Sequence, residues 1–217
     1  MLAFFLNLIY LILHKNPTIH MIDENLLLSY GAEYEKYPSR AIIFREGDKP
    51  NCYYQIVEGR VKLNHFDESG KEVILAILGP GLSVCELLLF IDQKYPVNAV
   101  VFEEATILKL HKKAFLQMND DHPKVARKVT KFMAERLYYK FLMLESNSSH
   151  LADVRIRGIL NYHKSFTPET SPYSYKVPLT RQQIASMTGL RVETVIRTIK
   201  MLEKKEILKI VDRSIFY

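Results

Sequence analysis

Residues 180–202 are the stretch of this chain that most constrains how it can fold. The first half has one apolar face at helical spacing, made by Ile184, Ala185 and Met187. Thr180 precedes that face as a suitable N-cap, and Gly189 follows it where a tight turn needs positive φ. The second half repeats apolar residues at helical spacing, at Leu190, Val195, Ile199 and Leu202. The stretch therefore predicts two short helices joined by a turn, a helix-turn-helix.

The second of these helices carries polar side chains opposite its apolar stripe. They are Arg191, Glu193, Thr194, Arg197 and Lys200. An arginine can donate two hydrogen bonds to guanine, and a carboxylate can accept one from cytosine. This face therefore suits base recognition in the major groove of DNA. For this segment alone, an ordinary pair of amphipathic helices with a solvated charged face is the alternative.

The positive charge of the chain lies in the same region as this motif. Residues 151–217 carry 12 Lys and Arg against 6 Asp and Glu, whereas residues 1–150 carry 18 of each. A surface that binds phosphates needs such an excess, so the distribution favours a nucleic-acid partner for the C-terminal part. A basic domain with no such partner would give the same count.

Cys52 and Cys85 are the only cysteines in the sequence. Two are too few for a disulfide framework or for a four-cysteine iron–sulfur cluster within one chain, so we expect the protein to lie in the reducing cytoplasm.

The run from Leu2 to Leu13 is almost wholly apolar but shorter than the roughly 20 residues that cross a bilayer. It also lacks the features of a signal peptide. We favour an added helix that packs on the body, or a start placed too early with Met21 as the natural beginning, over a membrane anchor.

Residues 42–110 are typical of short antiparallel strands separated by Gly-containing turns. The expected strands are Ile42–Phe44, Tyr53–Val57, Arg60–His65, Glu72–Ile77 and Thr106–Leu110, with turns at Glu46–Asp48, Glu58-Gly59, Glu68–Gly70 and Gly79–Gly81, and a short helix or buried turn at Glu86–Ile91. Closely spaced strands with glycine at the corners favour a barrel or roll.

A long amphipathic helix is predicted to start near Asp121. Its apolar stripe suits a coiled-coil seam between two chains, or burial against its own domain, and consists of Val125, Val129, Met133, Leu137, Phe141 and Leu144. The polar run Glu145–Ser149 is interpreted as a hinge. A helix over residues 151–163 follows, and two strands near the C-terminus, Ile207–Val211 and Ser214–Tyr217, predict a wing beside the helix-turn-helix.

A β-roll, a long helix and a winged helix-turn-helix, in this order, resemble the Crp/Fnr family of bacterial transcription regulators. The resemblance covers residues 25–217 and is most specific from Leu179 to Arg197 (LTRQQIASMTGLRVETVIR) and in Leu202-Glu203-Lys204. In the β-half it rests on Gly47-Asp48, Tyr54–Gly59, Gly70–Glu72 and Cys85–Leu87.

The resemblance implies an α+β fold: an antiparallel β-roll of the cyclic-nucleotide-binding type (a double-stranded β-helix), a dimerisation helix and a DNA-binding domain. The expected parts are a 1–20 extension, a 21–118 sensor domain, a 119–147 dimerisation helix with its hinge, and a 148–217 winged helix-turn-helix. The partners it implies are double-stranded DNA, a second copy of the chain and RNA polymerase, with no membrane.

The residues that we expect to contact DNA are Thr180, Arg181, Gln182, Arg191, Val192, Glu193, Thr194, Arg197 and Lys200. In the family, a glutamate and an arginine four residues later read a G·C-containing half-site, and here these are Glu193 and Arg197. The residue before the glutamate is arginine in cyclic-AMP-responsive members and valine in Fnr-like members, so Val192 favours TTGA-like over TGTGA half-sites. Ile196 departs from the serine of the Fnr-like pattern, which leaves the outer base open.

The sensor half departs from the cyclic-nucleotide binders of the family. They have Phe-Gly-Glu-Leu and then Arg-Ser-Ala or Arg-Thr-Ala, whose arginine pairs with the cyclic phosphate. Here the tentative effector pocket consists of Val84, Cys85, Glu86, Leu87, Val97 and Asn98. Because Val97 cannot neutralise a phosphate, we predict that cyclic AMP does not bind. Glu86 is interpreted as a residue that could serve only to hold the roll together.

The effector itself stays open. Haem is one alternative, with His14, His20, His65 or His111 as ligands, and a redox thiol at Cys85 is another. A signalling module whose helical tail contacts proteins is the alternative function. A metal enzyme of the cupin type needs clustered ligands, and His65 and His111 stand alone in the sequence, so we expect no metal site and no catalysis.

Overall fold

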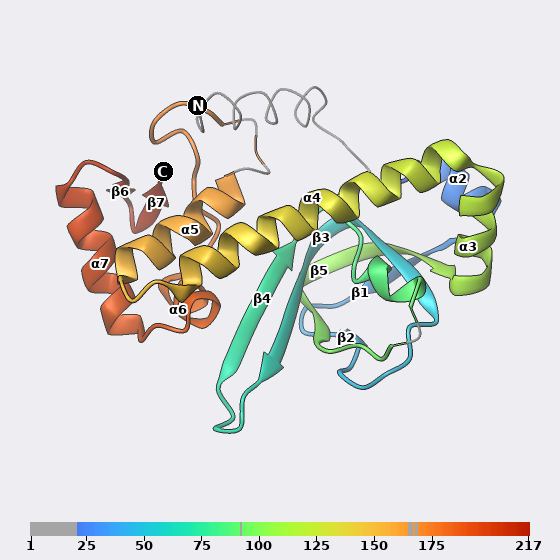
Figure 1. Ribbon diagram of the computed structural model, residues 1–217, viewed down its shortest axis with the longest axis horizontal. Coiled ribbons are helices and arrows are strands. Elements are labelled where there is room, and N and C mark those ends of the chain that lie inside the picture. Colours follow the sequence, from blue (N-terminus) through green and yellow to red (C-terminus); the bar gives the residue numbers. More distant parts are fainter. Residues whose placement is uncertain (1–20, 92, 165–166, 168) are drawn as a thin grey trace. The chain divides into compact units, whose positions relative to one another are not determined.

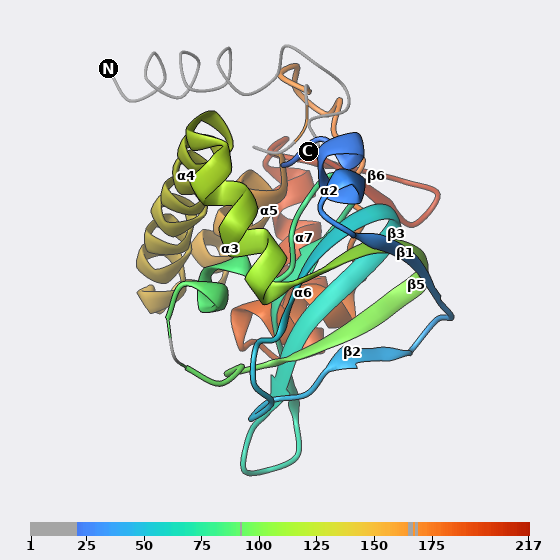
Figure 2. The ribbon, with the colours of Figure 1, turned by 90° about the vertical axis from the view of Figure 1, so that its right-hand side faces the viewer.

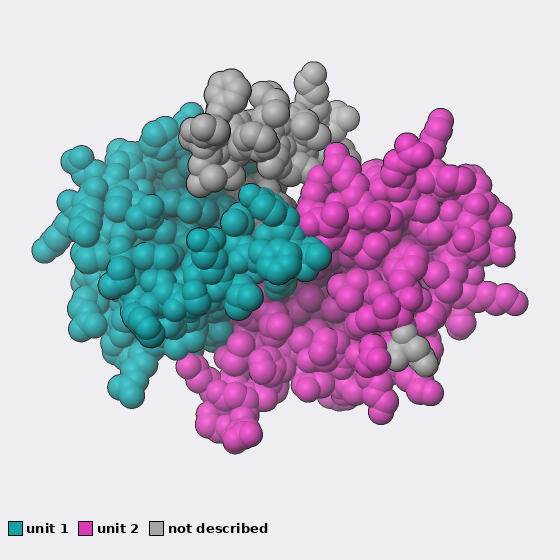
Figure 3. All heavy atoms as spheres, in the orientation of Figure 1, with its two compact units in different colours: residues 1–17, 137–217 teal, residues 18–136 magenta. Residues whose placement is uncertain are grey.

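The computed structural model describes residues 21–217 apart from residues 92, 165–166 and 168 (Figure 1). The apolar N-terminal run lies outside the described residues. The chain forms two compact units, whose described parts are residues 21–136 and 137–217 (Figure 3). In the part of the chain that the structure covers, no helix combines the length and the apolar content that a membrane crossing requires.

The first unit is built on one antiparallel sheet (Figure 2). Its strands are β1 (Glu33–Tyr37), β2 (Ile42–Phe44), β3 (Cys52–Phe66), β4 (Glu72–Leu78) and β5 (Asn98–His111). The order is β1-β5-β3-β4, and β2 also pairs with β5. β3 and β4 form a long hairpin whose tip extends beyond the other strands (Figure 1). The helical elements of this part are α2 (Glu24–Ser29), the 3-10 helix η1 (Glu86–Leu89), α3 (Lys112–Asp121) and α4 (Pro123–Ser148).

Strand β3 separates two clusters of buried side chains. Alternate residues of a strand point to opposite faces, so the neighbours Tyr53 and Tyr54 enter different clusters. The Tyr54 cluster fills the inside of the roll with Val84, Cys85, Val97 and other residues of the strands. The Tyr53 cluster joins the sheet to the segment at Met21 and to α2, α3 and α4, and Tyr53 stacks on Phe115 with ring centroids 4.6 Å apart.

Glu58 and Gly59 were expected to end a strand, and this prediction is wrong because β3 continues through them. Gly59 has a φ of +80° and lies among register shifts of the ladder with β5, so it is the bulge that bends one long strand. A Cβ at this position would lie 2.2 Å from the carbonyl oxygen of Glu104. Only glycine therefore allows the two strands to approach here.

The long helix also differs from its prediction in two ways. Glu145–Ser148 were interpreted as part of a hinge, but they form the last turn of α4. The predicted seam is wrong for Val129, which is 1% exposed and buried in the core of its own unit. Val125 and Met133 pack partly against the same core. Only the C-terminal part of the stripe is exposed, with Leu137, Phe141 and Leu144 at 56%, 60% and 68%.

The second unit is a small helical domain with a β-hairpin. It contains the end of α4, then α5 (Ala152–Lys164), α6 (Arg181–Thr188), α7 (Val192–Lys204), β6 (Lys209–Val211) and β7 (Ser214–Phe216). Buried apolar residues of the three helices form its core: Ile156, Ile159, Leu160, Ile184, Ala185, Val195, Ile199 and Leu202. Lys176 adds a single bridge to Phe216 at the edge of the hairpin.

Candidate nucleic-acid interface

Helix α6 begins with a capping box. Thr180 Oγ1 accepts a hydrogen bond from the backbone N–H of Gln183 at 3.2 Å, and Gln183 Oε1 accepts one from the N–H of Thr180 at 2.7 Å. The two bonds satisfy backbone donors that the first helical turn leaves unpaired. The capping box makes Thr180 a structural residue, whatever else it contacts.

Gly189 ends α6 with a φ of +69°, and α7 starts after the N-cap Arg191. This tight turn lets the buried faces of both helices meet, with Ile184 on α6 and Val195 on α7 completely buried. Packing against α6 therefore fixes the orientation of α7 and covers only one side of this helix.

The other side of α7 is open to solvent. Glu193 and Arg197 lie one helical turn apart on this exposed face, and Arg191, Ile196 and Lys200 are exposed beside them. Val192 and Thr194 are half-buried at its edge. The structure thus brings the polar residues of the predicted recognition helix to one surface, and their pattern of donors and acceptors can meet base edges.

Strands β6 and β7 form a wing beside these helices. The turn between them consists of Asp212 and Arg213, both at positive φ (46° and 63°), which matches the right-handed twist of a two-residue hairpin. Arg181, half-buried at the start of α6, donates a hydrogen bond to the carbonyl oxygen of Arg213 at 2.5 Å. The wing tip is therefore tied to the helix-turn-helix, and Arg213 is an exposed cation that the sequence reasoning missed.

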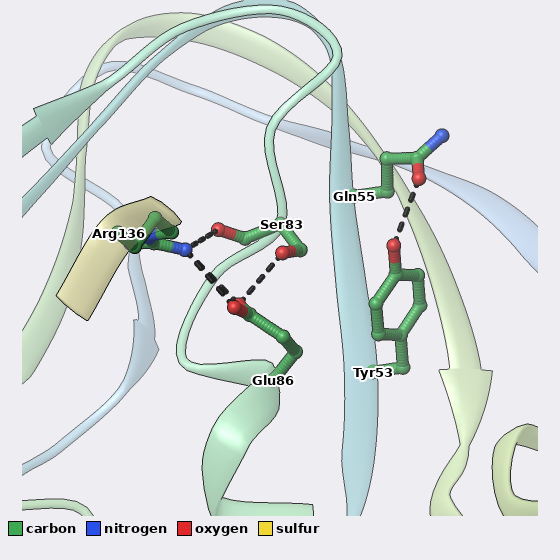
Figure 4. Close-up of polar contacts among 5 residues, drawn as sticks. All are labelled: Tyr53, Gln55, Ser83, Glu86 and Arg136. Carbon is green, nitrogen blue, oxygen red and sulfur yellow. Dashed lines mark hydrogen bonds and ion pairs between the residues drawn. The ribbon is translucent and has the colours of Figure 1, made fainter. Parts of the chain in front are cut away.

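In the first unit, Glu86 has a buried carboxylate with protein partners (Figure 4). Ser83 Oγ donates to Glu86 Oε2 at 2.6 Å, and Arg136 Nη1 lies 3.2 and 3.1 Å from the two carboxylate oxygens. The same nitrogen donates to the carbonyl oxygen of Ser83 at 3.1 Å. Arg136 was not singled out from the sequence, although a buried glutamate signals that a cation must lie near it.

The six residues of the tentative effector pocket lie in different environments. Val84, Cys85 and Val97 belong to the apolar cluster inside the roll. Asn98 uses its amide on the backbone, since Oδ1 accepts from the N–H of Glu46 and Nδ2 donates to the carbonyl of Asn64. Leu87 is exposed and is not brought together with the others.

The comparisons with known proteins assign both halves of the chain. A family model described as a cyclic nucleotide-binding domain matches residues 34–122, and one described as a Crp-like helix-turn-helix domain matches residues 135–216. The cAMP-activated global transcriptional regulator CRP of Salmonella typhimurium is 30% identical over 186 residues, which cover 83% of this chain and 87% of that protein. The chain belongs to the Crp/Fnr family. It is a bacterial transcription regulator with a DNA-binding helix-turn-helix, and its relatives are regulators rather than enzymes.

Solved structures share the fold of this Crp/Fnr chain. A CooA mutant from Carboxydothermus hydrogenoformans gives a TM-score of 0.75 at 20% identity, covering 93% of this chain and 92% of that one. The c-di-GMP responsive regulator CLP of Xanthomonas campestris gives 0.70 at 21% identity, covering 88% and 96%. The predicted α+β fold and family are thus confirmed.

A cyclic nucleotide, which the family implies as effector, does not fit the residues of this Crp/Fnr chain. Val97, which the resemblance places at the position of the phosphate-binding arginine, is 6% exposed among apolar side chains. Cys85, which by the resemblance stands in place of a glycine, adopts a φ of +54° with its side chain in the same cluster. A phosphate placed there would lose its hydration and meet no compensating charge from Val97.

The residues named for the other effector chemistries are histidines and a cysteine. In the described ranges, no group of three or more His, Cys, Asp or Glu side chains could hold a metal ion. His14 and His20 lie outside these ranges. Burial raises the pKa of Cys52, which favours the protonated thiol over the nucleophilic thiolate. Cys85 is buried as a small apolar side chain.

Proposed function

We propose that this regulator binds a palindromic DNA site with TTGA-like half-sites as a homodimer. The observation that carries the proposal is the exposed pair Glu193 and Arg197 on α7, which can accept from cytosine and donate to guanine one helical turn apart. Val192 precedes this pair, as in the Fnr-like members of the family. Thr180, Arg181, Gln182, Arg191, Thr194 and Lys200 are proposed to contact the same site, mainly through phosphates.

The homodimer is proposed to pair through the C-terminal part of α4. Leu137, Phe141 and Leu144 are large, exposed and spaced by four and three residues, which is the spacing of a coiled-coil seam. A two-fold dimer presents two copies of α7 and therefore selects a palindrome. RNA polymerase is the further partner that such a regulator would contact.

The test is a binding selection from randomised DNA duplexes with the purified full-length protein at a stated salt concentration. Enrichment of a palindrome with TTGA-like halves is the expected result. A Val192→Arg variant, selected in parallel, should shift the preference toward TGTGA-like halves. Failure to enrich any sequence, also with cell extract added, would refute DNA recognition and leave the helical tail as a protein-contact module.

A further inference from the structure

We infer that DNA binding by this chain is independent of cyclic nucleotides. In this inference, the contacts between Glu86 and Arg136 hold α4 in place without a bound ligand. The inference rests on the proposed function, since it concerns what controls α7. Arg136 is, in this inference, a positioning residue: it touches no base and affects DNA binding by holding α4 in place.

The first step is that both oxygens of the Glu86 carboxylate already have protein partners. It is 1% exposed, and both of its oxygens lie within hydrogen-bond distance of Arg136 Nη1. Oε2 additionally accepts from the hydroxyl of Ser83. A ligand hydroxyl that approached Glu86 would compete with these protein donors for its two oxygens, and a buried charge that loses its partner is costly.

The second step is that the rest of the site is closed by apolar packing. Val97 and Cys85 share a cluster with Tyr54 and Tyr95, and Phe44 stacks on Tyr95 with ring centroids 3.6 Å apart. An anionic nucleotide would have to open this cluster and then lie beside the carboxylate of Glu86. Opening the cluster and placing an anion beside a carboxylate both oppose binding. An arginine could offset these costs, but its position holds Val97.

The third step concerns what the ion pair joins. Glu86 opens η1, and the two following residues anchor that segment on both sides of the sheet, Leu88 in the Tyr54 cluster and Leu89 in the Tyr53 cluster. Arg136 lies on α4, one residue before the exposed apolar part of the helix begins. The pair therefore fixes this part of α4 to the sheet of its own unit, and this contact needs no effector.

The experiment measures the dissociation constant of the full-length protein for the selected duplex, with and without excess cyclic AMP, cyclic GMP or c-di-GMP. Unchanged affinity is expected in every case, and calorimetric titration of each nucleotide into the protein should give no binding heat. A nucleotide that tightens DNA binding would overturn the inference and leave the proposed function intact. Absence of specific DNA binding under all conditions would overturn both.

Variants test the role of Arg136. Arg136→Ala should weaken DNA binding roughly tenfold, a typical coupling between sites, at a temperature where circular dichroism shows the variant folded. Because all the contacts described come from one nitrogen, the ammonium of Arg136→Lys should restore most of the affinity. Arg127→Ala removes an exposed arginine of the same helix and should leave affinity unchanged. A folded Arg136→Ala protein with wild-type affinity would refute the positioning role.

Discussion

Glu193 and Arg197 are exposed on a helix whose opposite face is fixed in the core, so their side chains can meet a base edge with little loss of order. Arg197→Ala should therefore cost about 1–3 kcal/mol at the cognate site and relax the preference at one base pair. Binding to a panel of duplexes with single base changes measures both effects. Lys205→Ala removes an exposed charge just after α7 and should weaken all duplexes equally. An unchanged base preference in Arg197→Ala would mean that this face does not read DNA.

His163 makes the stability of the second unit depend on pH. Burial lowers its pKa from 6.5 to about 4, and its Nε2 has no hydrogen-bond partner among the residues that the structure describes. The unfolded chain therefore binds a proton between these two pH values and the folded chain does not, so stability is full above pH 6.5 and falls as the pH drops toward 4. The loss is at most about 3 kcal/mol.

Urea unfolding at a series of pH values measures this dependence. His163→Phe should flatten the pH profile relative to the wild type, because phenylalanine takes up no proton. The exposed His150, replaced in His150→Gln, provides the control and should keep the wild-type profile. If His163→Phe kept the full slope, the pH dependence would have to come from other groups.

At the scale of elements, the bulge at Gly59 shows why a strand can pass through a residue that usually ends one. Gly59→Ala should destabilise the protein by more than the cost of positive φ alone, since the new Cβ would meet the Glu104 carbonyl at 2.2 Å. Gly70→Ala is the matched control, with a φ of +77° and no atom within 4 Å of the new Cβ, and should cost about 1 kcal/mol. Equal losses of unfolding free energy in the two variants would contradict a steric role for this contact.

The helix-turn-helix could be predicted from sequence because its caps, turn glycine and apolar spacing are all local signals. The bulge at Gly59 could not be predicted, because a local sequence pattern does not reveal that β5 pairs with β3 on both sides of this residue. The burial of Val129 in its own unit was only one of two alternatives for a similar reason, since an apolar stripe does not say which surface covers it. Arg136 lies 50 residues from Glu86, and only the fold brings the two together.

The exposed part of α4 carries the next prediction. Phe141→Glu places two charges at the proposed two-fold seam and loses the burial of a phenylalanine there, so the proposed dimer should dissociate roughly a hundredfold more readily. Sedimentation measures this. Phe66→Glu changes a phenylalanine of matching exposure, 59% against 60%, at the end of β3 and should leave the dimer intact. A dimer that survives Phe141→Glu would place the interface elsewhere, and one lost in both variants would extend it to the hairpin.

For the whole molecule, the uneven charge determines how DNA binding responds to salt. The net charge of +6 equals the excess of residues 151–217, because residues 1–150 are neutral. Each phosphate that a cation neutralises adds about 0.9 to the magnitude of the slope of log affinity against log salt. Lys200→Gln, which removes an exposed cation of α7, should lower that magnitude by about one and weaken specific and non-specific duplexes alike. Lys124→Gln, which removes an exposed cation of the neutral part, should leave the slope unchanged. Equal changes in the two variants would mean that DNA contacts both halves of the chain, and the charge distribution would then no longer locate the binding surface.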